Sequence, residues 1–205
     1  MEIQKMPRPS KFDKNEAVET VMQEIWSHGY SAATVKSLSE KLGITRSSFY
    51  NAFDTREALF AKVMEVYAAR SPDAVLSDIT PGEKVVPKIV EVFRAVAKQR
   101  AEDPEHRGCM IINTLNEVHG RDQEVLDMTA AAVNASTERF RQLLAIARAQ
   151  GEIADDADIA KIAPALQNLL AGLNTMARAV HDEDALWTPV HTTLQALGLS
   201  CACLD

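Results

Sequence analysis

Polar side chains suited to recognition recur at helical spacing in residues 45–53, which read TRSSFYNAF. Arg46 and Tyr50 are four residues apart and therefore share one face of a helix. Ser47 and Asn51 lie together beside that face. Arginine can bind guanine edges, asparagine can bind adenine edges, and hydroxyl groups can bind phosphates. The pattern predicts a surface that reads duplex DNA, although a helical domain of any function also has a polar outer face.

The elements that must hold this surface are helices with recognisable starts and ends. Asp13 is expected to cap a helix over residues 13–28, where apolar residues recur at a spacing of four, and Gly29 ends it. Thr34 is expected to cap a short second helix. Gly43 stops that helix in the left-handed backbone region, which glycine adopts most easily.

A third helix is expected to begin after the cap Thr45, with Phe49 and Phe53 both facing the core. A fourth begins after the cap Thr55. Two helices joined by a tight turn, the second with polar residues exposed at its start, form the helix-turn-helix arrangement that enters a major groove. Arg56 starts the fourth helix, where a cation is unfavourable unless an anion such as a phosphate is close.

The formal charge of −7 is divided unevenly along the 205 residues. Residues 1–70 carry ten Lys and Arg against nine Asp and Glu, whereas residues 71–205 carry twelve against twenty. Residues 1–11 hold three cations, one acid and two prolines that prevent a regular helix, and they are interpreted as a basic arm. The acidity of the second part leaves the first part compatible with DNA.

Residues 12–67 resemble the DNA-binding domain of TetR-type transcriptional repressors. The resemblance is carried by Gly29-Tyr30, Thr34-Val35, residues 38–44 (LSEKLGI) and residues 48–60 (SFYNAFDTREALF). Arg56 stands where the family usually has Lys, and Phe49 where it usually has Leu. The resemblance implies phosphate contacts for Thr34, Tyr50 and Arg56. It also implies a DNA-facing role for Thr45, and it places Arg46, Ser47 and Asn51 nearest the bases.

The rest of the chain is predicted to be helical over residues 83–100, 108–118, 122–150, 158–181 and 184–197. Interruptions at residues 71–73 and 80–82 place a domain joint after residue 70. The expected fold class is all-α, with a DNA-binding helix-turn-helix domain of three to four helices and a C-terminal helical bundle. The expected divisions are a basic arm over 1–11, the DNA-binding domain over 12–70, a ligand-binding and dimerisation domain over 71–199 and a tail over 200–205.

The expected helix over residues 158–181 is apolar on more than one face, which indicates burial against more than the neighbours in its own chain. The resemblance implies that the last two long helices form a homodimer interface. A dimer would present two recognition helices to a palindromic operator. A central helix in a monomer produces the same apolar pattern, so both interpretations stay open at this point.

Residues 107–117 are the predicted ligand-binding region, because Asn113 and Asn116 interrupt an otherwise apolar helix. The predicted lining of a small-molecule pocket is Phe93, Cys109, Met110, Asn113, Phe140, Asn168 and Met176. Ordinary core packing accounts for each of these residues singly. Gly108 and Cys109, followed by apolar residues and Asn, resemble a segment in one branch of the family, some of whose members respond to electrophiles or oxidants. Cys109 is therefore a candidate sensor.

Three cysteines indicate free thiols rather than a disulfide framework. Cys109 would be reactive if Arg107 or His106 favoured its thiolate, and a buried inert cysteine fits the sequence equally well. Cys201 and Cys203 lie in the tail. No Cys and His spacing predicts a structural metal, metal sensing is left open, and no cofactor is expected. Neither a membrane-spanning run nor a signal peptide pattern is found, so a cytosolic protein is expected.

These patterns predict a homodimeric transcriptional regulator, in particular a repressor, that binds a palindromic operator. A small-molecule effector or a thiol modification in the C-terminal domain would release it, with coupling near residues 70–82 and 103–120. The effector must prefer a half-site spacing unsuited to DNA. One alternative is an enzyme with Cys109 as nucleophile and His106 or His119 as base, for which no further constellation is found. Another is a helical ligand-binding or adaptor protein without DNA binding.

Overall fold

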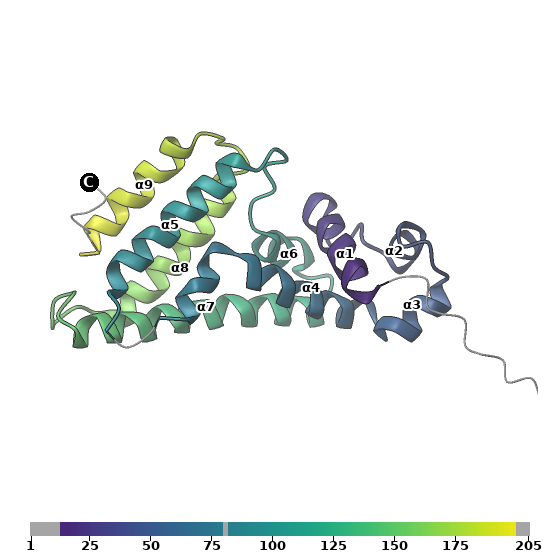
Figure 1. Cartoon of the computed structure of the whole chain (residues 1–205), viewed down its shortest axis with the longest axis horizontal. Coiled ribbons are helices and arrows are strands. Elements are labelled where there is room, and N and C mark those ends of the chain that lie inside the picture. The colour runs from purple at the N-terminus through teal and green to yellow at the C-terminus, as the bar shows by residue number, and fades with distance from the viewer. Residues whose placement is uncertain (1–12, 80–81, 200–205) are drawn as a thin grey trace, which may run out of the picture.

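The computed structural model describes residues 13–79 and 82–199, which form helices and turns and contain no strand (Figure 1). The predicted arm over residues 1–11 and the tail with Cys201 and Cys203 lie outside the described residues. The all-α fold class is confirmed. The elements are α1 (Lys14–His28), α2 (Val35–Lys41), α3 (Arg46–Phe53), α4 (Arg56–Arg70), the 3-10 helix η1 (Pro72–Ser77), α5 (Val85–Glu102), α6 (Met110–Val118), α7 (Gln123–Ala149), α8 (Ile159–Met176) and α9 (Glu183–Ala196).

The first four helices begin at the caps that the sequence predicts. In each, a side-chain oxygen accepts a hydrogen bond from a backbone N–H in the first turn, which would otherwise have no partner within the helix. The four caps are Asp13, Thr34, Thr45 and Thr55. Gly43, with φ of 65°, makes the turn between α2 and α3 in the left-handed region that disfavours other residues.

Helices α1 to α4 form the head of the molecule, and their apolar faces share one core. Phe49 and Phe53 of α3 contact each other there, with 5.4 Å between their ring centroids. The head does not complete this core alone, because Met110 and Val118 of α6 and Val125 of α7 are also part of it. The predicted boundary after residue 70 thus matches the end of α4 along the chain, but in space α6 and the start of α7 pack with the head.

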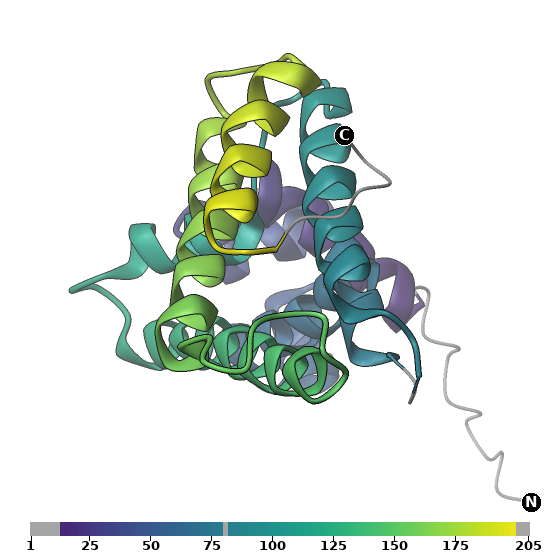
Figure 2. The same cartoon turned by 90° about the vertical axis from the view of Figure 1, so that its left-hand side faces the viewer.

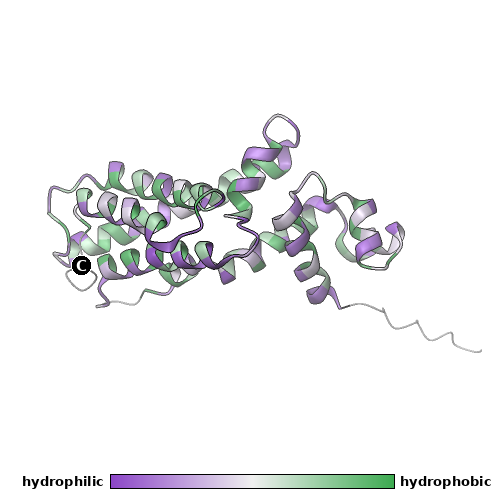
Figure 3. Cartoon of the chain, turned by 90° about the horizontal axis from the view of Figure 1, so that it is seen from above, coloured by the Kyte–Doolittle hydropathy of each residue, from purple (hydrophilic) through white to green (hydrophobic). Residues whose placement is uncertain are grey.

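Helices α5, α7, α8 and α9 form the body. Figure 2 views α7 nearly along its axis and shows α5, α8 and α9 standing side by side on one flank of it. Their buried residues make a second core, which includes Phe93, Phe140, Leu166 and Leu194. Hydrophilic and hydrophobic residues alternate along these helices (Figure 3), as expected of helices that each bury one face. Helix α7 contributes to both cores.

Two features of the body differ from the sequence prediction. The helix expected over residues 158–181 ends at Met176, and the chain continues as a turn from Ala177. Ala177 is still fully buried, as its place in the apolar pattern predicts. The pattern indicates which residues are buried, but it does not indicate where the backbone hydrogen bonds of the helix end. The interruption after residue 70 contains the short helix η1, which the sequence did not predict. The other four expected helices start and end within two residues of the observed ones.

Candidate nucleic-acid interface and ligand pocket

The outer face of α3 is made of the residues that the sequence predicts. Arg46, Ser47, Tyr50 and Asn51 are all exposed. Tyr50 is 50% exposed although it is aromatic, while its neighbour Phe49 is completely buried on the opposite face. The outward groups are one guanidinium, two hydroxyls and one amide, which suit contacts to base edges and phosphates.

Thr34 and Thr45 are exposed at the N-termini of α2 and α3. The Thr34 hydroxyl accepts a 3.1 Å hydrogen bond from the Ser37 N–H, and the Thr45 hydroxyl accepts one of the same length from the Ser48 N–H. These caps fix how the two helices start. The N–H groups that remain unpaired at the start of α3 favour an anion, because they lie at the positive end of the helix dipole.

Arg56 lies in a different setting from the other predicted DNA-facing residues. It is partly buried, its guanidinium stacks 4.0 Å from the ring centroid of Tyr30, and it pairs with Asp122 at 3.2 Å. Burial raises the pKa of Tyr30 above its usual range, and the nearby Arg56 charge opposes that shift. Since Asp122 is the cap of α7, Arg56 ties the head to the start of α7. Its contact with phosphate stays a prediction.

The chain around α6 holds the head against the body. The Glu117 carboxylate accepts hydrogen bonds from the backbone N–H groups of Tyr30, at 2.9 Å, and Ser31, at 2.8 Å. The Trp26 indole of α1 donates to the Gly108 carbonyl at 2.9 Å. These contacts involve residues within 103–120, part of the stretch for which coupling is predicted.

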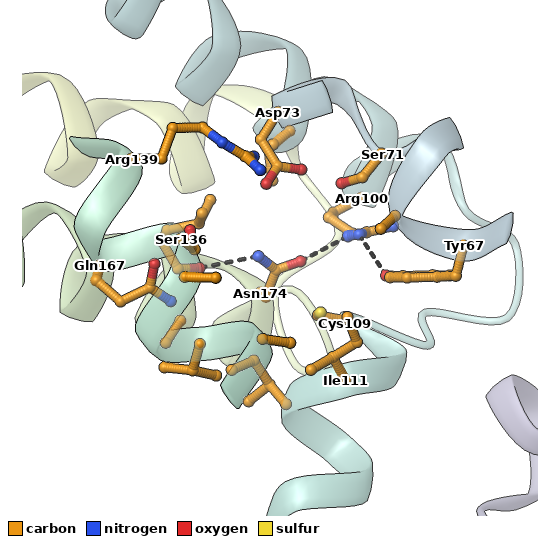
Figure 4. Close-up of a pocket in the computed structure, with 18 residues that line it drawn as sticks. Tyr67, Ser71, Asp73, Arg100, Cys109, Ile111, Ser136, Arg139, Gln167 and Asn174 are labelled. Atoms are coloured by element: carbon orange, nitrogen blue, oxygen red, sulfur yellow. Dashed lines mark hydrogen bonds between the residues drawn. The ribbon is translucent and has the colours of Figure 1, made fainter. Parts of the chain in front are cut away.

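A cavity of about 270 Å³ lies where head and body meet (Figure 4). Residues from α4, α5, α6, α7, α8 and the region of η1 line it. Half of them are small or aliphatic and half are polar or charged, a mixture that can hold the apolar part of a small molecule and orient its polar groups. The lining residues are Tyr67, Ala68, Ser71, Asp73, Val96, Arg100, Cys109, Ile111, Ile112, Ala132, Val133, Ala135, Ser136, Arg139, Gln167, Leu170, Ala171 and Asn174.

The structure does not bring the predicted pocket residues into one cavity. Of the predicted set, Cys109 lines the cavity. Phe93 and Phe140 instead stack on each other in the body core, with 6.1 Å between ring centroids. Met110 is buried in the head core. Their apolar spacing correctly marks buried positions, but it does not indicate which core or cavity a buried position faces.

The other three predicted pocket residues also lie elsewhere. The Asn113 amide donates to the Arg107 carbonyl at 2.6 Å, which stabilises the loop before α6. Asn168 and Met176 line a separate groove of about 250 Å³ between α8 and α9. Met176 is 55% exposed there. Asn113 and Asn168 are thus polar residues within apolar helices, and neither of them lines the cavity.

A buried arginine is the polar centre of the cavity wall. Arg100 is 3% exposed, its Nε donates to Oδ1 of Asn174 at 2.7 Å, and an Nη donates to Oη of Tyr67 at 3.0 Å (Figure 4). Asn174 donates in turn to the Leu170 carbonyl at 2.9 Å. Sequence reasoning missed Arg100. A signal was present, because Arg100 follows Val96 at helical spacing on the apolar face of α5, where a cation must be partnered.

Tyr67 connects the cavity to the head, since it lies in the last turn of α4. Its hydroxyl accepts hydrogen bonds from Arg100 and from the Met110 N–H, the latter at 3.2 Å, and its ring meets Trp26 edge to face at 5.2 Å. The Cys109 side chain is a further polar neighbour of this hydroxyl. Burial, and next the Cys109 neighbour, raise the pKa of Tyr67 above its usual range, so the phenol stays neutral.

Neither histidine named as a base in the enzyme alternative forms a hydrogen bond with Cys109 within residues 13–79 and 82–199. The His106 ring stacks on His181, with 3.4 Å between ring centroids. His119 follows the last turn of α6 whereas Cys109 precedes the first, roughly 15 Å apart along the helix axis. The described residues therefore show no hydrogen-bonded pair of a Cys109 nucleophile and a histidine base.

Arg107, the other group considered for Cys109, is engaged elsewhere. It forms an ion pair with Asp103 at 3.0 Å, and its guanidinium lies 4.0 Å from the Trp26 ring centroid. Burial alone would raise the pKa of Asp103, but hydrogen bonds from Arg107 outweigh it and hold that pKa below its usual value. The loop before α6 is thereby fixed to α1.

No group of three or more His, Cys, Asp or Glu side chains within residues 13–79 and 82–199 could hold a metal ion. None of the helices in these residues combines the length and apolar character needed to cross a membrane. The groups on α3 and in the cavity are donors, acceptors and apolar surfaces, which suit binding.

Comparison with known proteins gives two family matches. The family described as "Bacterial regulatory proteins, tetR family" matches residues 18–63, and "Tetracyclin repressor-like, C-terminal domain" matches residues 85–192. The first match includes α2 and α3 with the turn between them. The second covers the helices of the body and α6, and it alone spans more than half of the chain.

Individual relatives agree with these matches. The HTH-type transcriptional repressor ComR of Escherichia coli is 27% identical over 190 residues, 92% of this chain and 90% of that protein. The HTH-type transcriptional repressor BdcR of Escherichia coli is 25% identical over 181 residues, 87% of this chain and 86% of that protein. A cysteine mutant of the TetR family transcriptional regulator CifR, complexed with 26-bp operator DNA, has a TM-score of 0.79 at 26% identity, covering 92% of this chain and 99% of that one. This chain belongs to the TetR family of transcriptional regulators.

Proposed function

We propose that the protein is a cytoplasmic, homodimeric repressor that binds a palindromic operator through α3 and releases it when an effector or a thiol modification acts on the body. The observation that carries operator binding is the exposed set on α3, within the stretch that matches the family's N-terminal description. Two Escherichia coli relatives are described as repressors, and the CifR structures are described in complex with operator DNA. These descriptions support the repressor role.

The exposed residues of α2 and α3 take different roles by their chemistry. Arg46 and Asn51 are suited to reading base edges, because each can make paired hydrogen bonds to one base. Ser47 lies beside them on α3. Thr34 and Tyr50 are suited to phosphates, contacts that position the helix without reading sequence.

The proposed phosphate contact of Arg56 depends on whether the phosphate can replace the partner that Arg56 already has. Its guanidinium already pairs with Asp122 and stacks on Tyr30. A phosphate near the start of α4 would compete with Asp122 for the same guanidinium. Operator binding at Arg56 would thus weaken its ion pair with Asp122 at the start of α7.

The test of the reading face is operator affinity, measured by fluorescence anisotropy with a duplex from the gene's own upstream region. The Arg46→Ala, Tyr50→Ala double variant is expected to bind at least about 100-fold more weakly, with a shallower salt dependence. The matched control is Arg141→Ala, which removes an exposed arginine of α7 that pairs with Glu138. Unchanged affinity and salt slope in the double variant would refute the reading face, and no specific binding by the wild type would favour the adaptor alternative.

The homodimer is proposed to form through the groove between α8 and α9. Leu169, Gly172, Met176 and Val180 line this groove, and the exposure of Met176 leaves apolar surface for a partner. A second copy related by a two-fold axis would bury the same patch on both subunits. Two α3 helices would then meet half-sites about one DNA turn, or a multiple of it, apart.

Sedimentation velocity tests this interface. Met176→Asp places a charge in the groove and is expected to yield a folded monomer, because an unpaired charge at a buried interface is costly. Val75→Asp is the matched control, since Val75 is 51% exposed in η1, away from the groove. A wild-type protein that sediments as a monomer, or a Met176→Asp variant that remains dimeric, contradicts this assignment.

Release of the operator is proposed to begin at the cavity and pass through Tyr67. The body residue Arg100 and the N–H at the start of α6 both donate to the Tyr67 hydroxyl, and Tyr67 belongs to α4. A ligand that moves either donor therefore acts on α4, which shares its core with α3. The shift in equilibrium requires that the ligand bind the released form more tightly.

Cys109 offers a second route to the same point, because it is partly exposed, lines the cavity and is a neighbour of the Tyr67 hydroxyl. Treatment with iodoacetamide, which alkylates the thiolate and releases iodide, is expected to weaken operator binding by the wild type and to leave Cys109→Ser unaffected. The control is the Cys201→Ser, Cys203→Ser variant, which should respond as the wild type does. Release that persists in Cys109→Ser removes the thiol response and leaves operator binding in place.

A further inference from the structure

Arg100 carries a positive charge that no carboxylate in residues 13–79 or 82–199 balances. The residue is 3% exposed, and an arginine guanidinium stays protonated in proteins. The acceptors that it reaches are the Asn174 amide oxygen at 2.7 Å and the Tyr67 hydroxyl at 3.0 Å, and both are neutral. A buried charge is unfavourable unless an opposite charge compensates it.

The guanidinium also keeps hydrogen-bonding capacity on the cavity side. An arginine offers five N–H donors in a planar fork. Arg100 directs one N–H to Asn174 and one to Tyr67, and its guanidinium lies 5.4 Å from the centroid of the uncharged Trp26 ring. Its other N–H groups have no hydrogen-bond acceptor in the described parts of the chain. The fork geometry matches a carboxylate, which can accept two parallel hydrogen bonds from it.

The other charges of the cavity do not replace this missing anion. The lining contains two more charged side chains, Asp73 and Arg139, which point toward each other in Figure 4. Their charges are opposite, so the lining as a whole keeps one positive charge. One uncompensated cation suits a monoanion such as a carboxylate better than a phosphate group, which carries close to two charges at neutral pH.

A second polar group of the cavity independently points to a ligand. Gln167 is 7% exposed, and its Oε1 has no hydrogen-bond partner in the described protein. A buried acceptor of this kind is costly to leave unpaired. The cavity of about 270 Å³ is close to the lower end of the volumes of small-molecule sites, which suits a small ligand.

We propose that the cavity binds a small organic carboxylate, with its anionic group on Arg100 and its apolar part against Ile112, Val133 and Leu170. A hydroxyl or N–H group elsewhere on the molecule would donate to Gln167. The carboxylate competes with the Tyr67 hydroxyl for the Arg100 fork. This inference rests on the proposed function only in treating the ligand as the effector, since binding itself does not depend on DNA.

Binding is tested by isothermal titration calorimetry on the full-length protein without DNA. The probes are two pairs that match in size and differ in charge: benzoate with benzamide, and butyrate with butyramide. Each carboxylate is expected to bind at least about tenfold more tightly than its amide, the contribution of a charge-assisted hydrogen bond. Equal affinities within both pairs, or no binding of either carboxylate at millimolar concentration, overturn the proposal.

Variants locate the site. Arg100→Gln is expected to lose the preference for the carboxylate, whereas the matched control Arg94→Gln keeps it. Arg94 lies on the same helix, and its guanidinium is 5.4 Å from the Trp187 ring centroid, outside the cavity. Because Arg100→Gln can fail to fold, Ala132→Phe is the second variant, which adds a large side chain to the cavity lining and leaves Arg100 itself unchanged. Undiminished carboxylate binding in Ala132→Phe contradicts the site.

Operator affinity, measured separately with and without benzoate, distinguishes the two proposals. Carboxylate binding that requires Arg100 and weakens operator binding supports both. Carboxylate binding that requires Arg100 and leaves operator affinity unchanged supports the site and contradicts its role as the effector site. A protein that releases the operator in response to thiol reagents but binds no carboxylate supports the repressor and overturns the inference.

Discussion

The outer face of α3 and the cavity wall around Arg100 are both polar, but their polar groups have opposite surroundings. Arg46, Ser47 and Asn51 are exposed, so water can satisfy them and DNA can replace that water. Arg100 and Asn174 are buried and bind each other. We therefore expect substitutions on α3 to change affinity for DNA with little change in stability, and substitutions in the wall to change stability first.

The largest loss of stability is expected for Asn174→Leu, at about 3 kcal/mol, because it leaves a buried guanidinium N–H without an acceptor. Arg100→Met should cost less than Asn174→Leu, since it removes the charge together with its donors. Urea unfolding at neutral pH gives both values. If Arg100→Met is the more destabilising of the two, the Arg100 charge itself stabilises the fold. That result would contradict the expectation that the buried charge is a cost which its partners offset.

The loss of stability expected for Thr45→Ala is smaller than for substitutions in the cavity wall and larger than for the exposed side chains of α3. Thr45 is exposed like the rest of the interface, yet its hydroxyl caps α3 through a hydrogen bond from the Ser48 N–H. Loss of a threonine cap costs about 1 kcal/mol, and Thr45→Ser should restore most of it. Thermal unfolding and operator affinity measured on the same samples separate the cap from any contact with DNA.

Asp103→Asn should have an effect similar to that of Thr45→Ala, about 1 kcal/mol at pH 7, because it removes the charge of a buried carboxylate that pairs with Arg107 but keeps one acceptor oxygen. The pKa of Asp103 is lower in the folded protein than its usual value. Its carboxylate therefore stabilises the fold above the usual pKa, near 4, and this stabilisation is lost as the pH falls through the folded pKa. The stability difference between wild type and Asp103→Asn should therefore shrink on acidification, and urea unfolding at a series of pH values measures it.

The smallest change in stability is expected for the Arg46→Ala, Tyr50→Ala double variant. Both side chains are exposed, and exposed substitutions away from caps and cores usually change stability by no more than about 0.5 kcal/mol. Urea unfolding of this variant beside the wild type checks it. A large loss would mean that the α3 face contributes to folding and would weaken the contrast between the two regions.

The head could be predicted well from the sequence because its signals are local. Capping side chains such as Asp13 and Thr55 act within three residues of themselves, and Gly43 makes its turn by its own backbone conformation. The exposed face of α3 follows directly from the buried positions of Phe49 and Phe53. Sequence spacing is therefore enough to describe this surface.

The cavity could not be predicted in the same way. Its wall joins residues from six elements, and Arg100 meets Tyr67 and Asn174 from positions far apart in the chain. The sequence marks Phe93 and Met110 as buried, which they are, but each belongs to a different core. Helical periodicity gives the direction of a side chain within its own helix and not the neighbour that it meets.

Helix α7 connects the cavity wall to the head as one continuous helix, so a tilt at the cavity moves the head. Its 27 residues make a rod of about 40 Å. Arg139 on the cavity wall and Val125 in the head core are separated by about 21 Å of that rod. A tilt of about 5° pivoting at the cavity moves the head end by roughly 2 Å. In a two-fold dimer both heads move. A rotation small enough to leave the packing of both cores intact therefore changes the separation of the two α3 helices by up to about 4 Å.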